Sequence, residues 1–296
     1  MPTFIDFVHQ QVRMRYRRAG FASGLFECER FTLRYYERPL PGSSATLVLI
    51  HGLGTSSSTW TRVLPELAGI CNVLALDLPG FGLSRINTGS EFAVFEELSE
   101  ALAAFIRQRT TQPILLLGHS LGGWLAAKFA ADNPESVRHL LLVNNAGILC
   151  EDTVGQGKAF QVESVGDLRR LLDLIWFRYP WYFRPFYHAV LSDLRRRRVA
   201  EFVRSIRTEN FLNDDLRKLT MDVSIIWGEQ DKLISMKSVN IMERSIPRAR
   251  VYLLKQCGHV PQLECPEEFV YVIREILQRE MSMENYSKSV TAPRKT

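Results

Sequence analysis

One short segment restricts the fold of this chain more than any other. The apolar run 113–117 leads directly into the motif Gly-His-Ser-Leu-Gly at 118–122, and an alanine-rich stretch, 124–130, follows. A buried strand, a tight turn and a helix must therefore follow one another without an intervening loop. The pattern G-x-S-x-G in this setting is typical of a nucleophile elbow, where a strained turn presents a serine. We predict that Ser120 is a nucleophile.

Apolar runs and amphipathic segments alternate along much of the chain. The expected strands are 45–50, 73–76, 113–117, 137–143, 223–227 and 250–254, and the expected helices are 60–67, 92–109, 237–246 and 266–280. Continuously apolar strands are buried on both faces, as in parallel sheets covered by helices. The alternation therefore predicts an α/β protein with a doubly wound, mostly parallel sheet. One antiparallel strand is expected before the first parallel strand, over residues 26–37.

The alternation stops between residues 148 and 219. Helical patterns flank an aromatic stretch, 175–187, and no candidate for a parallel strand is present. We expect an inserted helical cap. The chain then divides into an N-terminal amphipathic segment (1–25), the first part of the core (26–147), the cap (148–219), the second part of the core (220–280) and a polar tail (281–296), which we expect to be disordered.

Composition limits the partners that this chain can bind and the cellular compartment in which we expect it. Hydrophobic residues make up 46% of the 296 and the net charge is +5, so a large core is possible and nucleic acid is not an expected partner. No apolar stretch reaches the ~18 residues of a membrane span, and the N-terminus does not resemble a signal peptide. The five cysteines form no CxxC pair, so we expect reduced thiols in a cytoplasmic chain.

A serine hydroxyl needs a base, and the base needs an acid that orients it. His259 follows the last expected strand, at the sheet edge from which Ser120 emerges, and is the predicted base. Asp231 follows the strand that ends at 227 and is the predicted acid, with Glu229 as the weaker alternative. Strand 137–143 is followed by two asparagines, which cannot serve as the carboxylate.

An oxyanion requires two backbone N–H groups. Leu121, next to the nucleophile, and Leu53, in the loop 51–54, are the predicted donors. No metal or other cofactor is expected for this chemistry.

Four further polar residues are interpreted as structural. His51 is expected to brace its loop, His119 to pack away from the site, and His139 to lie at the opposite end of its strand. Asp77 precedes a Leu-Pro-Gly turn and is expected to shape that loop.

Five motifs in order resemble those of the α/β-hydrolase superfamily, from about residue 26 to residue 279. They are HGLG at 51–54, DLPGFG at 77–82, GHSLGG at 118–123, GEQD at 228–231 and CGH at 257–259. The chain looks most like the lipase and esterase branch with a helical cap, in particular ABHD6-type monoacylglycerol lipases. Membrane-bound members of that branch carry a spanning helix, whereas this N-terminus shows only a short amphipathic one. The serine excludes relatives with an aspartate at the elbow, but carbon–carbon bond hydrolases also use serine and stay open.

The resemblance implies that the cap shapes the substrate pocket. Gly52 and the cap aromatics Trp176, Trp181, Phe183 and Phe186 are the predicted substrate-binding residues. The aromatic stretch either packs against the core or meets lipid at a membrane surface. Arginines at 195–198 are interpreted as a solvated helix, with attraction to anionic headgroups as the alternative.

Three functions follow. The first is hydrolysis of carboxylic esters with an apolar acyl chain, such as monoacylglycerols, with peripheral membrane contact. The second uses the same triad for carbon–carbon cleavage or acyl transfer. The third is a ligand receptor on the hydrolase fold with little turnover.

Overall fold

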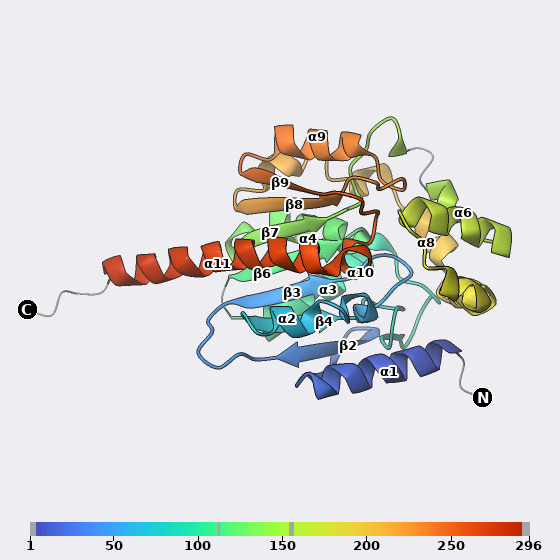
Figure 1. Ribbon diagram of the computed structural model, residues 1–296, viewed down its shortest axis with the longest axis horizontal. Helices are drawn as coiled ribbons and strands as arrows, with labels where there is room; N and C mark the ends of the chain where they lie inside the picture. Colours follow the sequence, from blue (N-terminus) through green and yellow to red (C-terminus); the bar gives the residue numbers. More distant parts are fainter. Residues whose placement is uncertain (1–3, 112, 154–156, 292–296) are drawn as a thin grey trace, which may run out of the picture.

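The computed structural model describes residues 4–111, 113–153 and 157–291. Its strands are β1 (Ala22–Cys28), β2 (Phe31–Arg38), β3 (Thr46–Ile50), β4 (Asn72–Leu76), β5 (Arg85–Ile86), β6 (Ile114–His119), β7 (Val137–Val143), β8 (Asp222–Gly228) and β9 (Ala249–Leu254). They form one sheet in the order β1-β2-β4-β3-β6-β7-β8-β9, with β5 beside β2 (Figure 1). Strand pairs from β4 to β9 are parallel, which confirms the predicted fold class.

The antiparallel edge differs from the single strand predicted over 26–37. The structure has a hairpin of β1 and β2, paired from Ala22 with Glu37 to Cys28 with Phe31. The chain reverses through Glu29 and Arg30, and Glu29 adopts a φ of 43°. Hairpin turns need such left-handed residues and usually take glycine or asparagine there. A glutamate in this position leaves no turn signal in the sequence.

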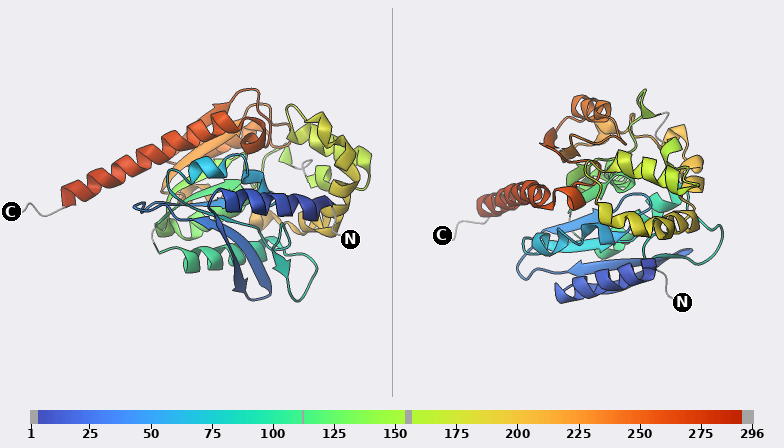
Figure 2. Two further views of the ribbon diagram at one scale, coloured as in Figure 1. Left: turned by 60° about the horizontal axis from the view of Figure 1, so that its bottom comes forward. Right: turned by 45° about the vertical axis from the view of Figure 1, so that its right-hand side comes forward.

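Helices cover both faces of the sheet (Figure 2). They are α1 (Phe4–Arg18), α2 (Leu64–Leu67), α3 (Phe95–Arg109), α4 (Leu121–Asp132), α9 (Met236–Ser245), α10 (Pro261–Glu264) and α11 (Pro266–Thr291). Side chains of one strand alternate between two apolar layers, so that Leu47 and Leu49 face one and Val48 and Ile50 the other. Both layers exclude water, which explains why the central strands are apolar throughout.

Helices and short 3₁₀ turns fill the described part of the insertion between β7 and β8. They are η3 (Gly157–Phe160), α6 (Val165–Ile175), η4 (Trp181–Phe186), α7 (Tyr187–Arg196), α8 (Val199–Ser205), η5 (Thr208–Asn210) and η6 (Leu216–Lys218). This cap lies at one end of the sheet (Figure 1). Its buried residues Leu168, Leu191 and Phe202 belong to the same apolar cluster as Val48 and Ile50.

The C-terminal helix is longer than predicted. Helix α11 continues to Thr291 and extends away from the cap, whereas the sequence predicts an end at 280 and a disordered tail after it (Figure 1). The segment after 280 is polar, but it contains neither glycine nor proline before Pro293, so no stop signal interrupts the helix. Residues 292–296 of the predicted tail and residues 1–3 of the N-terminal segment lie outside the described residues. Among the described helices, none combines the length and apolarity that crossing a bilayer requires.

Candidate active site

Ser120 sits on the turn between β6 and α4, as the elbow motif predicted. Its backbone adopts φ 54° and ψ −119°, a conformation that L side chains rarely adopt. Hydrogen bonds hold it there: the Ser120 N–H donates to the Val143 carbonyl at 3.0 Å, and its carbonyl accepts from Trp124 N–H at 3.1 Å and Ala146 N–H at 3.1 Å. The strain is thus balanced by contacts to the neighbouring strand end and the following helix.

The glycines of the motif are required by close backbone approach. A Cβ on Gly118 would lie 2.2 Å from the Gly122 carbonyl oxygen, and one on Gly122 would lie 2.4 Å from the Ile50 carbonyl oxygen. Both distances are far shorter than a van der Waals contact, and the oxygen atoms belong to rigid backbone. The elbow therefore fits against β3 only without side chains at these positions.

His259 and Asp231 form the second half of the site. The Nδ1 atom of His259 lies 2.8 Å from Oδ2 of Asp231, and both side chains are buried. Oδ1 of Asp231 accepts from the N–H groups of Leu233 at 2.8 Å and Ile234 at 3.0 Å. With Nδ1 occupied, Nε2 is the imidazole nitrogen that can serve as base. Glu229, the weaker candidate acid, is exposed.

Sequence reasoning used Asn144 only to exclude a carboxylate, but the structure gives this residue a role of its own. Its side-chain amide donates to Oδ2 of Asp231 at 2.7 Å and accepts from Gly228 N–H at 3.1 Å. Asn144 is fully buried and has a φ of 39°. The carboxylate of Asp231 is therefore held from β7 as well as from its own loop. The only sequence signal for this contact was the position of Asn144 at the end of a strand.

His119 also differs from its predicted role, because it contacts the loop that carries His259. Its Nε2 hydrogen-bonds the His259 carbonyl oxygen at 2.8 Å, and the two rings lie 5.0 Å apart. Burial, and then the nearby His259, hold the pKa of His119 well below its ordinary value. His119 is thus a neutral donor that fixes the backbone of the base.

The loop after β3 is braced by His51, as predicted. Nε2 of His51 accepts from Leu78 N–H at 2.9 Å, so its Nδ1 carries the proton and donates to the Gly52 carbonyl at 2.8 Å. Thr55 Oγ1 donates to the same carbonyl at 2.8 Å. Burial lowers the pKa of His51 to about 4, so the ring stays neutral. In a planar trans peptide the N–H points opposite to the carbonyl, so these bonds also set the direction of the Leu53 N–H.

Asp77 shapes its loop, as predicted. One carboxylate oxygen accepts from the N–H and the hydroxyl of Ser57, at 2.7 and 2.6 Å, and the other from Leu83 N–H at 2.8 Å. Asp77 is also not among the residues that line the cavity at Ser120.

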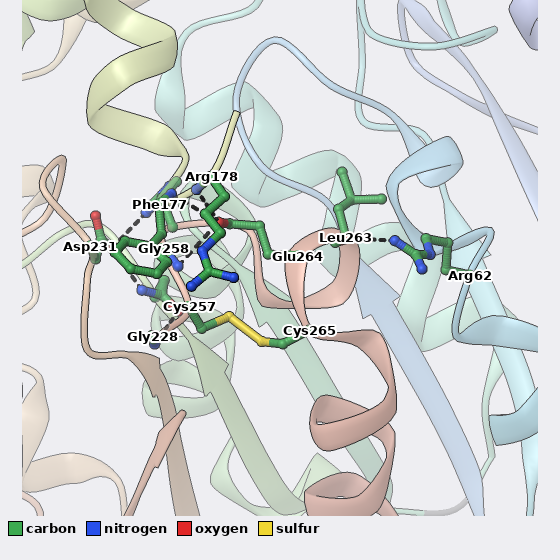
Figure 3. Close-up of a disulfide and its surroundings, with 12 residues drawn as sticks. Arg62, Phe177, Arg178, Gly228, Asp231, Cys257, Gly258, Leu263, Glu264 and Cys265 are labelled. Atoms are coloured by element: carbon green, nitrogen blue, oxygen red, sulfur yellow. Dashed lines mark hydrogen bonds and ion pairs between the residues drawn. A yellow bond between two sulfur atoms is a disulfide. The ribbon is translucent and has the colours of Figure 1, made fainter. Parts of the chain in front are cut away.

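The prediction that all cysteines are reduced is wrong for two of them. Cys257 and Cys265 form a disulfide that closes the loop carrying His259 (Figure 3). The two residues are eight positions apart and form no CxxC, so the spacing did not reveal the bond. Reduced thiols therefore no longer support the predicted cytoplasmic location.

The same loop holds the cap through Glu264. Its Oε1 accepts from Gly258 N–H at 3.1 Å, and its Oε2 accepts from Phe177 N–H at 2.8 Å (Figure 3). His259 N–H donates to the Ile175 carbonyl at 2.7 Å. Burial raises the pKa of Glu264 in spite of these donors. Sequence reasoning missed this carboxylate, because its partners are backbone groups of a distant segment.

A cavity of about 170 Å³ joins the two halves of the site. Ser120, His259, Leu53 and Gly52 line it together with Trp176, and its remaining wall is mostly apolar: Phe160, Leu168, Leu171, Leu172, Ile175, Val190, Leu194, Val199, Leu233, Val260 and Leu263. Leu121 begins α4 directly after Ser120, where helix N–H groups have no partner within the helix. Three predicted substrate-binding residues, Trp181, Phe183 and Phe186, are not among the residues that line this cavity.

Residues 47–270 match the model of the alpha/beta hydrolase family. The chain belongs to this family. The order Ser120, Asp231, His259 and the elbow geometry agree with that membership, and the chain is accordingly a hydrolase.

Individual relatives differ in their reactions. The 2-hydroxymuconate semialdehyde hydrolase of Pseudomonas sp. (strain CF600) is 28% identical over 255 residues, covering 80% of this chain and 88% of the relative. Monoacylglycerol lipase abhd6-A of Xenopus laevis is 22% identical over 282 residues, covering 86% of this chain and 81% of the relative. The crystal structure of a membrane phospholipase A superposes with a TM-score of 0.80 at 27% identity, covering 93% of this chain and 91% of that one. The superfamily resemblance is confirmed, and the substrate is not decided by these relatives.

Proposed function

We propose that this chain cleaves carboxylic esters with an apolar acyl chain, including monoacylglycerols or related lipid esters. In the proposed mechanism Ser120 Oγ attacks the ester carbonyl while His259 Nε2 accepts its proton. Asp231 keeps the imidazole oriented, and the N–H groups of Leu53 and Leu121 stabilise the oxyanion. His259 then protonates the leaving alcohol, and water hydrolyses the acyl-enzyme by the same steps.

The mostly apolar wall of the cavity favours ester hydrolysis over carbon–carbon cleavage. No lysine or arginine is among the described residues that line it. Among the relatives is a 2-hydroxy-6-oxo-2,4-heptadienoate hydrolase, 26% identical, whose substrate by its name is a carboxylate. An ionised carboxylate is costly to bury without a cationic partner. An apolar acyl group has no such requirement and gains from burial.

Cavity size adds a second expectation about the substrate. The cavity of about 170 Å³ is smaller than the roughly 300–1,000 Å³ typical of pockets for drug-sized ligands. A short acyl group fits such a space, whereas a long one requires the cap to move. We therefore expect long-chain esters to depend on cap motion.

An ester series from acetate to palmitate, with a monoacylglycerol and a dienoate ketone alongside, tests the proposal. We expect turnover of the esters and of the monoacylglycerol, and none of the dienoate. Faster cleavage of the dienoate than of any ester would favour the carbon–carbon reaction. Ligand binding with no turnover of any substrate would favour a receptor.

A further inference from the structure

An aromatic cluster lies exposed on the outer turn of the cap. In η4, Trp181 is 74% exposed, Tyr182 59% and Phe183 39%. The rings contact one another, with centroids 6.2 Å apart for Trp181 and Tyr182 and 5.3 Å for Tyr182 and Phe183. We call these three residues, with the exposed Arg184 that follows them, the aromatic turn. Contiguous exposed apolar surface of this kind marks an interaction site more often than chance exposure does.

Residue type and charge identify the partner. Trp and Tyr have an apolar body and a polar tip, which is why they are favoured where lipid tails meet headgroups. The segment 176–187 contains two arginines, Arg178 and Arg184, both exposed, and no aspartate or glutamate. This combination is complementary to an anionic lipid surface. Two copies of the chain joined through the same turn would bring like charges together.

The arginines at 195–198 are less suited to this role than the sequence suggested. Arg197 is buried, where it donates to Asp193 at 2.6 Å and to the Gly80 carbonyl at 3.2 Å. Arg196 pairs with Asp193, and Arg198 pairs with Glu91 and Glu201. Most of this positive charge is therefore compensated within the protein. The basic side chains beside the aromatic turn are the better candidates for headgroup contacts.

A chain of rings connects the aromatic turn with the active site. Phe183 lies 6.3 Å from Tyr179, and Tyr179 lies 5.9 Å from Trp176, centroid to centroid. Trp176 lines the cavity that holds Ser120 and His259. A surface that binds this turn therefore lies next to the cap segment that lines the active-site cavity.

We propose that the aromatic turn docks the protein on the surface of an anionic lipid bilayer. Trp181, Tyr182 and Phe183 insert at the headgroup boundary, while Arg178 and Arg184 contact the headgroups. Docking does not require hydrolysis, so this proposal stands apart from the proposed ester substrate.

Vesicle sedimentation of the full chain tests the proposal. We expect binding to vesicles of phosphatidylcholine mixed with phosphatidylglycerol, and weaker binding to phosphatidylcholine alone. The triple variant Trp181→Ala, Tyr182→Ala, Phe183→Ala should weaken binding by roughly tenfold or more, because its rings supply most of the inserted apolar area. Tyr271→Ala is the matched control, since Tyr271 is 61% exposed but lies on α11, and it should bind as the parent does.

A charge variant tests the same proposal independently if the triple variant does not fold. Arg184→Glu should weaken binding to the anionic vesicles and reduce its dependence on salt, and leave binding to phosphatidylcholine alone unchanged. The proposal is overturned if the parent binds neither kind of vesicle, or if both variants bind as the parent does. It is also overturned if the parent self-associates without lipid and the triple variant is monomeric, since a second copy would then occupy the turn. Ser120→Ala should bind vesicles normally, which separates docking from hydrolysis.

Discussion

Among single residues, the proposed triad depends on side chains that lie at the ends of several strands and are held there by hydrogen bonds. Ser120 is presented by β6, Asp231 follows β8, and His259 follows β9. Each has a separate role in the proposed acyl transfer.

Replacing Ser120 with alanine removes the nucleophile but leaves the elbow backbone intact. We expect turnover of esters to fall on the order of 10⁶-fold, because loss of a triad member in a serine hydrolase removes the whole covalent route. Labelling of the intact protein by a fluorophosphonate probe should disappear in the variant. Activity that survives the change at a comparable rate would exclude Ser120 as the nucleophile.

Asn144 is expected to act through Asp231. The variant Asn144→Ala removes the hydrogen bond of 2.7 Å to the carboxylate. A hydrogen bond to a charged group contributes about 1.5–3 kcal/mol, so kcat should fall roughly ten- to a hundredfold while KM changes little. Asn213→Ala, at an exposed site, is the control for the measurement. If kcat is equal in the two variants, Asn144 does not help to position Asp231.

Among the elements, the loop closed by the Cys257–Cys265 disulfide joins His259, the proposed base, to the cap. Glu264 in this loop accepts from Gly258 on one side and from Phe177 and Arg178 on the other. In Glu264→Gln, one acceptor oxygen becomes a donor that faces backbone N–H groups. We expect kcat/KM for esters to fall about tenfold, since His259 and the cap lose a common anchor.

Glu267→Gln, at an exposed position on α11, is the matched control for Glu264→Gln. Steady-state kinetics on a soluble ester, with thermal unfolding as a check of the fold, measure the effect. A lower unfolding temperature with unchanged kinetics would assign Glu264 a purely structural role.

A second anchor holds helix α11 on the sheet. Glu280 lies 2.8 Å from His139 Nδ1, while His139 Nε2 bonds Ser224 at 2.9 Å. The carboxylates of Glu280 and Asp222 lie close enough to His139 to suggest a metal site. Both ring nitrogens, however, already have partners in the protein, and Asp222 pairs with Arg248 at 2.9 Å. We interpret this cluster as a structural network.

The network predicts a pH dependence of stability. Burial raises the pKa of Glu280, but the hydrogen bond and charge of His139 and the charges of Arg138 and Arg250 outweigh it, so the pKa is lowered overall. A lowered carboxyl pKa stabilises the fold above the ordinary pKa of glutamate, and this contribution is lost as the pH falls through the folded-state value. Glu280→Gln should cost about 1–3 kcal/mol of unfolding free energy at neutral pH and flatten the acid limb of the stability profile. Parallel pH profiles of parent and variant would contradict this.

In the whole molecule, cap and core share one apolar cluster, and we therefore expect them to unfold together. Leu168 and Phe202 of the cap share an apolar cluster with Val48, Leu116 and Ile225 of the sheet. Because this cluster extends from the sheet into the cap, unfolding of either part would expose apolar side chains of the other. We expect a single calorimetric transition with equal calorimetric and van't Hoff enthalpies. Two resolved transitions would show that the cap unfolds by itself.

The alternating architecture, which the structure confirms, and the three residues proposed as the triad can both be predicted from the sequence. Both depend on local patterns: apolar runs, a glycine-flanked serine, and polar residues that directly follow strands. Such patterns fix which strand end carries each side chain, and parallel strands then bring those ends to one edge. Ser120, Asp231 and His259 could therefore be named before their distances were known.

Which groups hold that site, and which face outward, follows from contacts between distant segments in the folded protein. The contacts of Asn144 with Asp231, of His119 with His259 and of Glu264 with the cap join segments 87 to 140 residues apart. The Cys257–Cys265 bond and the exposure of Trp181 likewise depend on how the cap and loops pack. Amino-acid pattern encodes which residues lie on one face of an element. It does not encode which distant backbone group will satisfy a buried polar side chain, because that depends on the packing of the complete fold.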